Sequence, residues 1–119
     1  MMTGIITNLR PRIELSVRGT GSHGIFEFTI DTGYEGTLTL PESICAVLHL
    51  IKDRESRFRL ADGSEINLSV YLLFVEWDSR ERRVEILALG EEPLLGATML
   101  DGYELCLNYK TNRLTIAEV

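Results

Sequence analysis

Segments in which apolar and polar residues alternate recur along the chain and predict β-strands. Residues 12–18 alternate in this way, and residues 26–30 do so again directly before Asp31. A period of two places one face of a strand on the core and the other in solvent. With the further strands expected at 57–61, 68–77, 84–89, 104–109 and 113–119, the pattern indicates about eight short strands in all.

Helical spacing is confined to two short stretches. Residues 41–50 place apolar side chains three and four positions apart, and Pro41 stands near the start, where its missing N–H costs nothing. Residues 97–100 follow a glycine and predict a short helical turn. Asp62-Gly63 separates two β-like runs and is typical of a type I′ hairpin. The sequence therefore predicts an all-β domain with one or two short helices.

Length and charge narrow the class of protein. The 119 residues and 13.4 kDa correspond to one domain, residues 1–119. A net charge of −6 disfavours binding to nucleic acid or to anionic lipid. No apolar run reaches the roughly 18 residues of a membrane span, and the N-terminus lacks the pattern of a signal peptide. We therefore expect a cytoplasmic protein with neither nucleic-acid nor membrane partners.

Two cysteines are present, Cys45 and Cys106, each between apolar neighbours. Neither belongs to a CxxC pair or a Cys/His cluster, and His23 and His49 lack the spacing of metal ligands. The sequence thus predicts two buried free thiols, no metal site and no cofactor.

The tripeptide Asp31-Thr32-Gly33 is the strongest candidate for chemistry. By itself it also suits an ordinary turn, since Asp bonds its own downstream backbone and Gly accepts unusual φ angles. Its context favours a site: an apolar strand leads into it, a second apolar segment leaves it, and Ala61-Asp62-Gly63-Ser64 and Leu94-Leu95-Gly96 follow in order. Over most of its length the chain resembles the single-lobed, retropepsin-like aspartic proteases, in particular their bacterial-type relatives.

The resemblance implies an acid-protease barrel that acts as a two-fold homodimer. Asp53, Asp62, Asp78 and Asp101 are not followed by Thr-Gly or Ser-Gly, so a second catalytic carboxylate has to come from a second copy. Two such carboxylates share one proton, and the pair activates water against the peptide bond of an extended or unfolded substrate. The site residues implied are Asp31, Thr32 and Gly33 for catalysis, Tyr34, Glu35, Ala61, Asp62 and Gly63 for substrate binding, and Leu94, Leu95 and Gly96 for support of the loop.

Several positions depart from that family's pattern. Tyr34 replaces the usual small residue, and Ala97 and Thr98 stand where retroviral members carry a basic residue, so Glu35 would lack its partner. The hairpin tip is poor in glycine and also fits a plain surface turn. The segment 114–119 is a candidate for pairing with the second copy. Two alternatives stay open: a non-catalytic peptide-binding or dimerisation module with the same fold, and an unrelated β-barrel.

Overall fold

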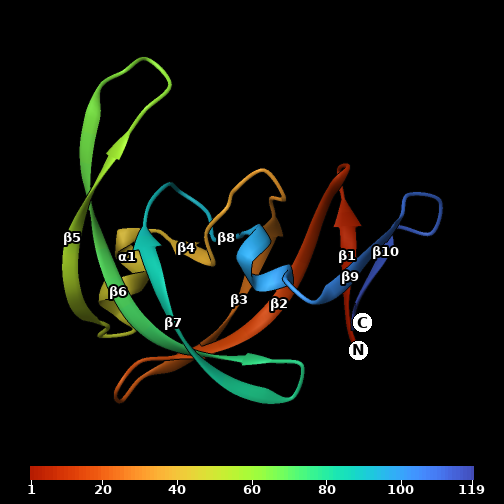
Figure 1. Ribbon diagram of the computed structural model, residues 1–119. Helices are drawn as coiled ribbons and strands as arrows, with labels where there is room; N and C mark the ends of the chain where they lie inside the picture. The colour runs from red at the N-terminus through yellow and green to blue at the C-terminus, as the bar shows by residue number, and fades with distance from the viewer.

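The computed structural model describes residues 1–119 as a single ten-stranded sheet that curls around its own core (Figure 1). Its elements are β1 (Met2–Thr7), β2 (Arg10–Arg18), β3 (His23–Ile30), β4 (Leu38–Leu40), α1 (Glu42–Val47), β5 (Ile51–Arg59), β6 (Glu65–Trp77), β7 (Arg80–Ala88), β8 (Leu94–Leu95), the 3₁₀ helix η1 (Ala97–Leu100), β9 (Tyr103–Asn108) and β10 (Arg113–Glu118). The strand order is β5-β6-β7-β4-β8-β3-β2-β1-β10-β9.

The predicted alternation holds in β2, where Ile13, Leu15 and Val17 are buried. In β3 it holds in part: Phe28 and Ile30 are buried, but so is the polar Thr29 between them. The structure adds strands that the pattern did not indicate. Met2–Thr7 forms β1, and β7 begins at Arg80, four residues before the strand expected at 84–89. The helix at 41–50 is shorter than expected and covers only Glu42–Val47.

Two tight turns explain the early start of β7 and the presence of β1. Asn8 and Leu9 join β1 to β2 with φ angles of 52° and 65°, and Asp78 and Ser79 join β6 to β7 with φ angles of 52° and 66°. Positive φ at both central residues of a two-residue loop is the type I′ arrangement. These turns use so few residues that the flanking charged segments remain in the sheet.

The type I′ prediction at Asp62-Gly63 is wrong. Only Gly63 has positive φ, 87°, and the loop closes through Gly63 N to Leu60 O at 2.9 Å and Leu60 N to Ser64 O at 2.8 Å. Asp62 Oδ1 accepts hydrogen bonds from Ser64 N at 2.8 Å and Ser64 Oγ at 2.6 Å, which lower its pKa. This side chain stabilises a longer loop, with a turn followed by one left-handed glycine.

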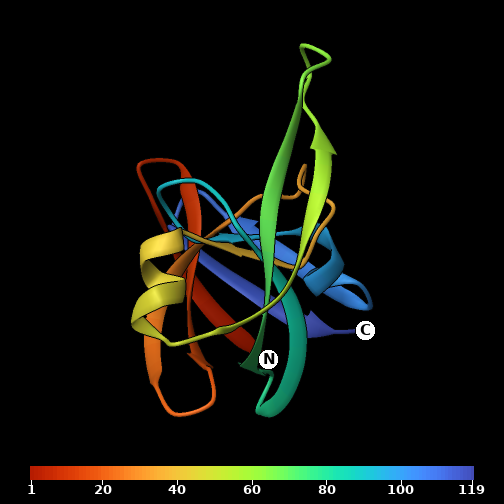
Figure 2. The same cartoon turned by 90° about the vertical axis from the view of Figure 1, so that its left-hand side faces the viewer.

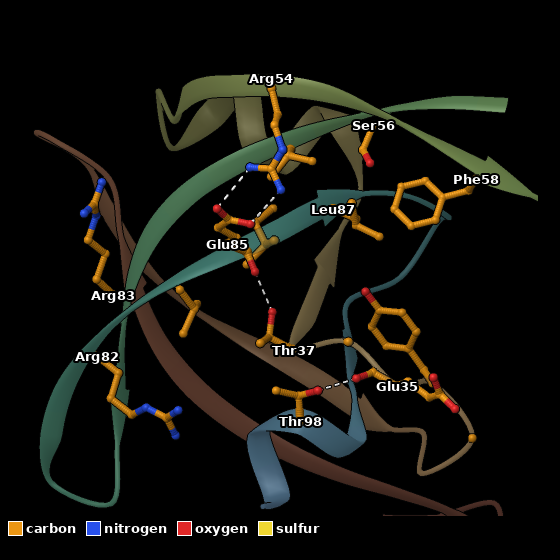
Figure 3. A pocket seen from close by; sticks show the side chains of 16 residues that line it. Glu35, Thr37, Arg54, Ser56, Phe58, Arg82, Arg83, Glu85, Leu87 and Thr98 are labelled. Carbon is orange, nitrogen blue, oxygen red and sulfur yellow. Dashed lines mark hydrogen bonds and ion pairs between the residues drawn. The ribbon is translucent and has the colours of Figure 1, made fainter.

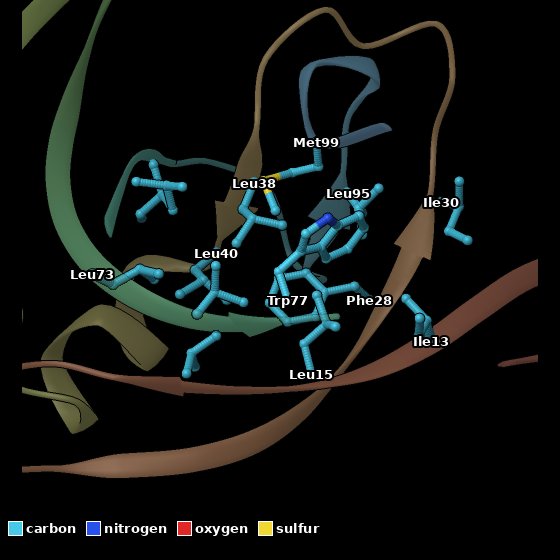
Figure 4. Packing of buried hydrophobic residues seen from close by; sticks show 14 of the residues in the cluster. Ile13, Leu15, Phe28, Ile30, Leu38, Leu40, Leu73, Trp77, Leu95 and Met99 are labelled. Carbon is cyan, nitrogen blue, oxygen red and sulfur yellow. The ribbon is translucent and has the colours of Figure 1, made fainter. Parts of the chain in front are cut away.

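The core lies between the curled halves of the sheet, directly beneath the loop that follows β3 (Figure 4). Phe28, Leu95 and Trp77 are fully buried and come from three different strands. The Trp77 ring meets the Tyr103 ring edge-on, with centroids 5.6 Å apart. This packing fixes β3 and β8 against each other at the point where the chain reaches Asp31.

The two cysteines differ in exposure. Cys45 on α1 is buried, and burial raises the pKa of its thiol to about 11. Cys106 is exposed, so the prediction of two buried thiols is wrong for it. Its neighbours Leu105 and Leu107 point to one face of β9, and the period of two sends Cys106 to the other.

The C-terminal hairpin is paired within its own chain. Residues of β10 pair with β1 on one side and with β9 on the other. The hypothesis that segment 114–119 pairs with a second copy is wrong for residues 114–116, because both sides of the strand are occupied there. For residues 117–119, which have no partner on the β1 side, it stays a prediction. No helix is long and apolar enough to cross a membrane, and no group of three or more His, Cys, Asp or Glu side chains is placed to hold a metal ion.

We expect Phe28→Ala to lower the free energy of unfolding by about 3–5 kcal/mol, since it leaves a cavity beneath the Asp31 loop. Ile25 lies on the same strand but is 68% exposed, so Ile25→Ala should change stability by less than about 0.5 kcal/mol. Urea unfolding of both variants tests this. Equal losses would show that the core does not lie where the structure places it.

Candidate active site

The loop carrying Asp31 bridges two strands that do not pair with each other. It leaves β3 at Ile30 and enters β4 at Leu38, and the two-residue strand β8 lies between them. Leu95 of β8 pairs with Ile30 in parallel and with Leu38 in antiparallel register. The loop of residues 31–37 therefore passes over β8, with the fully buried Leu95 beneath it.

Backbone hydrogen bonds fasten this loop to β8 and η1. Asp31 N donates to Leu95 O at 2.9 Å, Gly96 N to Thr37 O at 2.7 Å, and Ala97 N to Tyr34 O at 2.7 Å. The Thr98 hydroxyl also donates to the Glu35 carbonyl. Leu95 and Gly96 thus contact both ends of the loop, the position that the sequence predicts for the supporting residues.

Gly96 is the point of closest approach. A Cβ there would overlap the backbone oxygens of Gly36 and Tyr34, so only glycine lets the two segments meet. The Tyr34 ring folds back over Gly36, which likewise has no room for a side chain. The ring is half-buried, and this burial raises the pKa of the Tyr34 phenol.

Asp31 combines a turn geometry with an accessible carboxylate. Its Oδ1 accepts a hydrogen bond from Gly33 N at 3.0 Å, and its carbonyl accepts one from Tyr34 N at 3.1 Å. The residue is nevertheless exposed, as are Thr32 and Gly33. A Cβ on Gly33 would meet only Asp31 Oδ1, at 3.3 Å. The tripeptide therefore forms an ordinary turn and at the same time leaves the Asp31 carboxylate accessible for chemistry.

Two hollows lie on either side of the Asp31 loop. The larger, about 810 Å³, runs from residues 33–37 across β5 and β7 to Thr98, and we call it the β5–β7 groove (Figure 3). The smaller, about 410 Å³, contains Asp31 and Thr32. We call it the Leu107 hollow, and its remaining lining residues are Leu9, Arg10, Pro11, Thr29, Ile30, Leu94, Leu105, Leu107 and Tyr109.

The structure does not bring every candidate residue to the groove. Tyr34, Glu35 and Gly33 line it. Ala61, Asp62 and Gly63 are exposed at the tip of the β5–β6 hairpin and do not line it. Figures 1 and 2 show this hairpin extending well away from the body of the sheet. Their role in substrate binding stays a prediction.

Sequence reasoning missed the residues that line the groove from β5 and β7. Ser56 and Phe58 face it from β5, and Arg82, Glu85 and Leu87 from β7. Phe58 carried a usable signal, since it is apolar within a strand of arginines near the predicted hairpin. The residues from β7 carried none, because their place depends on the long-range pairing of β7 with β4.

Glu35 is exposed and takes part in no ion pair. Ala97 and Thr98 of η1 stand where retroviral members carry a basic residue. The Thr98 hydroxyl donates to the backbone carbonyl of Glu35 and not to its carboxylate. The loop is thus tied to η1 through main-chain atoms, and the Glu35 side chain remains free in the groove.

Solved structures resemble this architecture over most of the chain. EIAV protease complexed with the inhibitor HBY-793 matches with a TM-score of 0.56 and 18% identity, over 80% of this chain and 90% of that one. A retropepsin-like aspartic protease from Rickettsia conorii matches with a TM-score of 0.58 and 12% identity, over 98% of this chain and 88% of that one. This chain has the retropepsin-like fold. No protein-family model and no curated protein matches it.

The retropepsin-like fold confirms the predicted all-β class with one or two short helices. It also overturns the alternative of an unrelated β-barrel. At this level of identity the likeness concerns the fold, and the chemistry has to be argued from the residues.

We expect Gly96→Ala to destabilise the chain by about 1–3 kcal/mol, because the new methyl group meets backbone that cannot move without releasing the loop. Gly21 is a matched control, since a Cβ there meets nothing within 4 Å. Gly21→Ala should leave stability unchanged or slightly raised. Urea unfolding compares the two variants. A Gly96→Ala variant as stable as wild type would contradict the close approach.

Proposed function

We propose that this chain is an aspartic endopeptidase that works as a homodimer and cuts extended peptides. The observation that carries the proposal is an exposed Asp31 carboxylate in an Asp-Thr-Gly turn, clamped by Leu95 and Gly96 at the boundary of two hollows. A turn that served folding alone would not require this combination of rigid backbone, accessible acid and adjacent groove.

The reaction needs two carboxylates within reach of one water molecule. Close like charges cannot both ionise, so the pair holds one proton between them. The ionised member takes a proton from water as the oxygen attacks the carbonyl carbon, and the protonated member donates a hydrogen bond to the carbonyl oxygen. Collapse of the tetrahedral species breaks the C–N bond, and the leaving nitrogen receives a proton. One chain supplies only Asp31, and the second acid is the same residue of a second copy.

The Leu107 hollow is a suitable surface for that second copy to bind. It contains Asp31 and Thr32, and most of the other residues that line it are apolar, with Arg10 and Thr29 as the polar exceptions. Leu9 is 77% exposed and Tyr109 50% exposed at its rim. Burial of such surface favours association. A two-fold axis through this hollow would set each Asp31 against its equivalent, with the Thr32 hydroxyls beside the axis.

We expect Asp31→Asn to abolish hydrolysis of a denatured protein substrate at about pH 4–6, because an amide cannot take a proton from the attacking water. Folding and dimerisation should persist, because the amide keeps an oxygen to accept the Gly33 N–H. Cleavage is followed by mass spectrometry and assembly by analytical ultracentrifugation. Equal cleavage by wild type and variant would exclude Asp31 as a catalytic residue.

The dimer interface is tested by the double variant Leu9→Asn, Tyr109→Ser. Asn tolerates the positive φ of residue 9, so the fold should survive, while the dissociation constant should rise at least about tenfold. The control pair Ile25→Ser, Val47→Ser removes side chains of similar exposure, 68% and 66%, elsewhere on the surface. Sedimentation checks both pairs, and the specific activity of the first should fall on dilution. A wild type that is monomeric at all concentrations would overturn the dimeric mechanism.

A second function is favoured by one observation: the β5–β7 groove is formed within one chain and contains no part of Asp31. A non-catalytic module could therefore bind peptides without the carboxylate pair. Under this alternative, Asp31→Asn and wild type would bind a peptide equally, and neither would cleave it.

A further inference from the structure

Arginines in this protein are for the most part neutralised by carboxylates. Acidic residues outnumber basic ones by 18 to 12, so partners are plentiful. Those in ion pairs are Arg10, Arg12, Arg18, Arg54, Arg57, Arg59 and Arg80. Arg82, Arg83 and Arg113 take part in none. Two of these three are consecutive residues of β7, and both line the β5–β7 groove.

The acidic residue that lines the groove from β7 is engaged by another arginine. Glu85, two residues beyond Arg83 and three beyond Arg82 on β7, accepts two hydrogen bonds from Arg54, at 3.0 Å and 2.9 Å. Arg54 also donates to Asp53 at 2.6 Å. These bonds with Arg54, and to a smaller extent the charge of Arg83, lower the pKa of Glu85. Arg82 lines the same groove and forms no ion pair with Glu85 or with any other carboxylate.

The unpaired side chains of Arg82 and Glu35 give two parts of the groove opposite charges. Figure 3 shows Arg82 extending from β7 toward Thr98 on η1, while Arg83 projects to the other side of the strand. Glu35 lies at the opposite side of the groove, on the Asp31 loop. Phe58 and Leu87 are apolar and lie apart from the Arg82 end. An anionic group would thus be attracted at the Arg82 end and repelled near Glu35.

We propose that Arg82, assisted by the charge of Arg83, binds the carboxylate of an Asp or Glu side chain in the substrate peptide. The inference rests on the proposed endopeptidase function, for which it names a substrate class: an extended peptide with an acidic residue flanked by bulky apolar ones. A guanidinium matches a carboxylate through two parallel N–H···O bonds. The apolar lining of the groove takes up the neighbouring side chains of the peptide.

Binding is measured with the full-length Asp31→Asn chain, so that turnover plays no part. The probes are fluorescein-labelled octapeptides of Ala, Phe and Leu in which a single Glu or Gln is moved through all eight positions. One position should bind Glu about tenfold more tightly than Gln, the scale of one charge-assisted hydrogen-bonded pair. The preference should shrink between 50 mM and 500 mM salt, because screening weakens it.

Arg82→Gln should remove this preference and Arg83→Gln should reduce it. The matched control is Arg113→Gln, which removes an equally unpaired arginine that lines a different hollow on β10, and it should leave the preference intact. Equal binding of Glu and Gln peptides at every position, or binding of none, would overturn the proposal. A preference that depends on Arg82, together with a wild type that cleaves nothing, would retain the site and reject only hydrolysis.

Discussion

The position of Asp31 depends on β8, a strand of two residues inserted between β3 and β4. Leu95 pairs with Ile30 on one side and Leu38 on the other, so the same residue fixes both ends of the loop. A shift of β8 by one residue would turn Leu95 out of the core and break the bond from Asp31 N. Because Leu95 is fully buried, hydrophobic burial enforces the register that sets the acid in place.

Glycine at position 96 makes this clamp close enough to be rigid. Its backbone contacts the Gly36 and Tyr34 carbonyls without an intervening side chain. Tyr34 is large, yet its ring folds over Gly36 and Gly96, where it completes the packing of the loop. The departure from a small residue after Asp-Thr-Gly is therefore accommodated inside the loop, by two glycines that leave room for the ring.

Sequence patterns predicted those elements whose structure depends on interactions between residues close together in the chain. Alternation located β2 and β3, and the Asp-Thr-Gly and Leu-Leu-Gly segments located the two halves of the clamp. Turn chemistry misled at Asp62-Gly63, where the Asp62 side chain bonds to Ser64 and stabilises a longer loop. Cys106 was misjudged because its apolar neighbours share the opposite face of β9. The groove residues Arg82 and Glu85 could not be assigned, since nothing near them in sequence indicates that β7 would pair with β4.

In the proposed dimer, the symmetry that creates the carboxylate pair also doubles the groove. The Asp31 loop separates the Leu107 hollow from the β5–β7 groove, so an axis through the hollow would place one groove on each side of the pair. An Arg82 would then lie beyond each end of the catalytic centre, with a Glu35 closer in. A peptide has an N-terminal and a C-terminal side, whereas the two grooves of a two-fold dimer are equivalent. An acidic residue on either side of the cut bond would therefore meet an equivalent arginine. The charges of the groove would then select peptides that are acidic away from the cut and uncharged beside it.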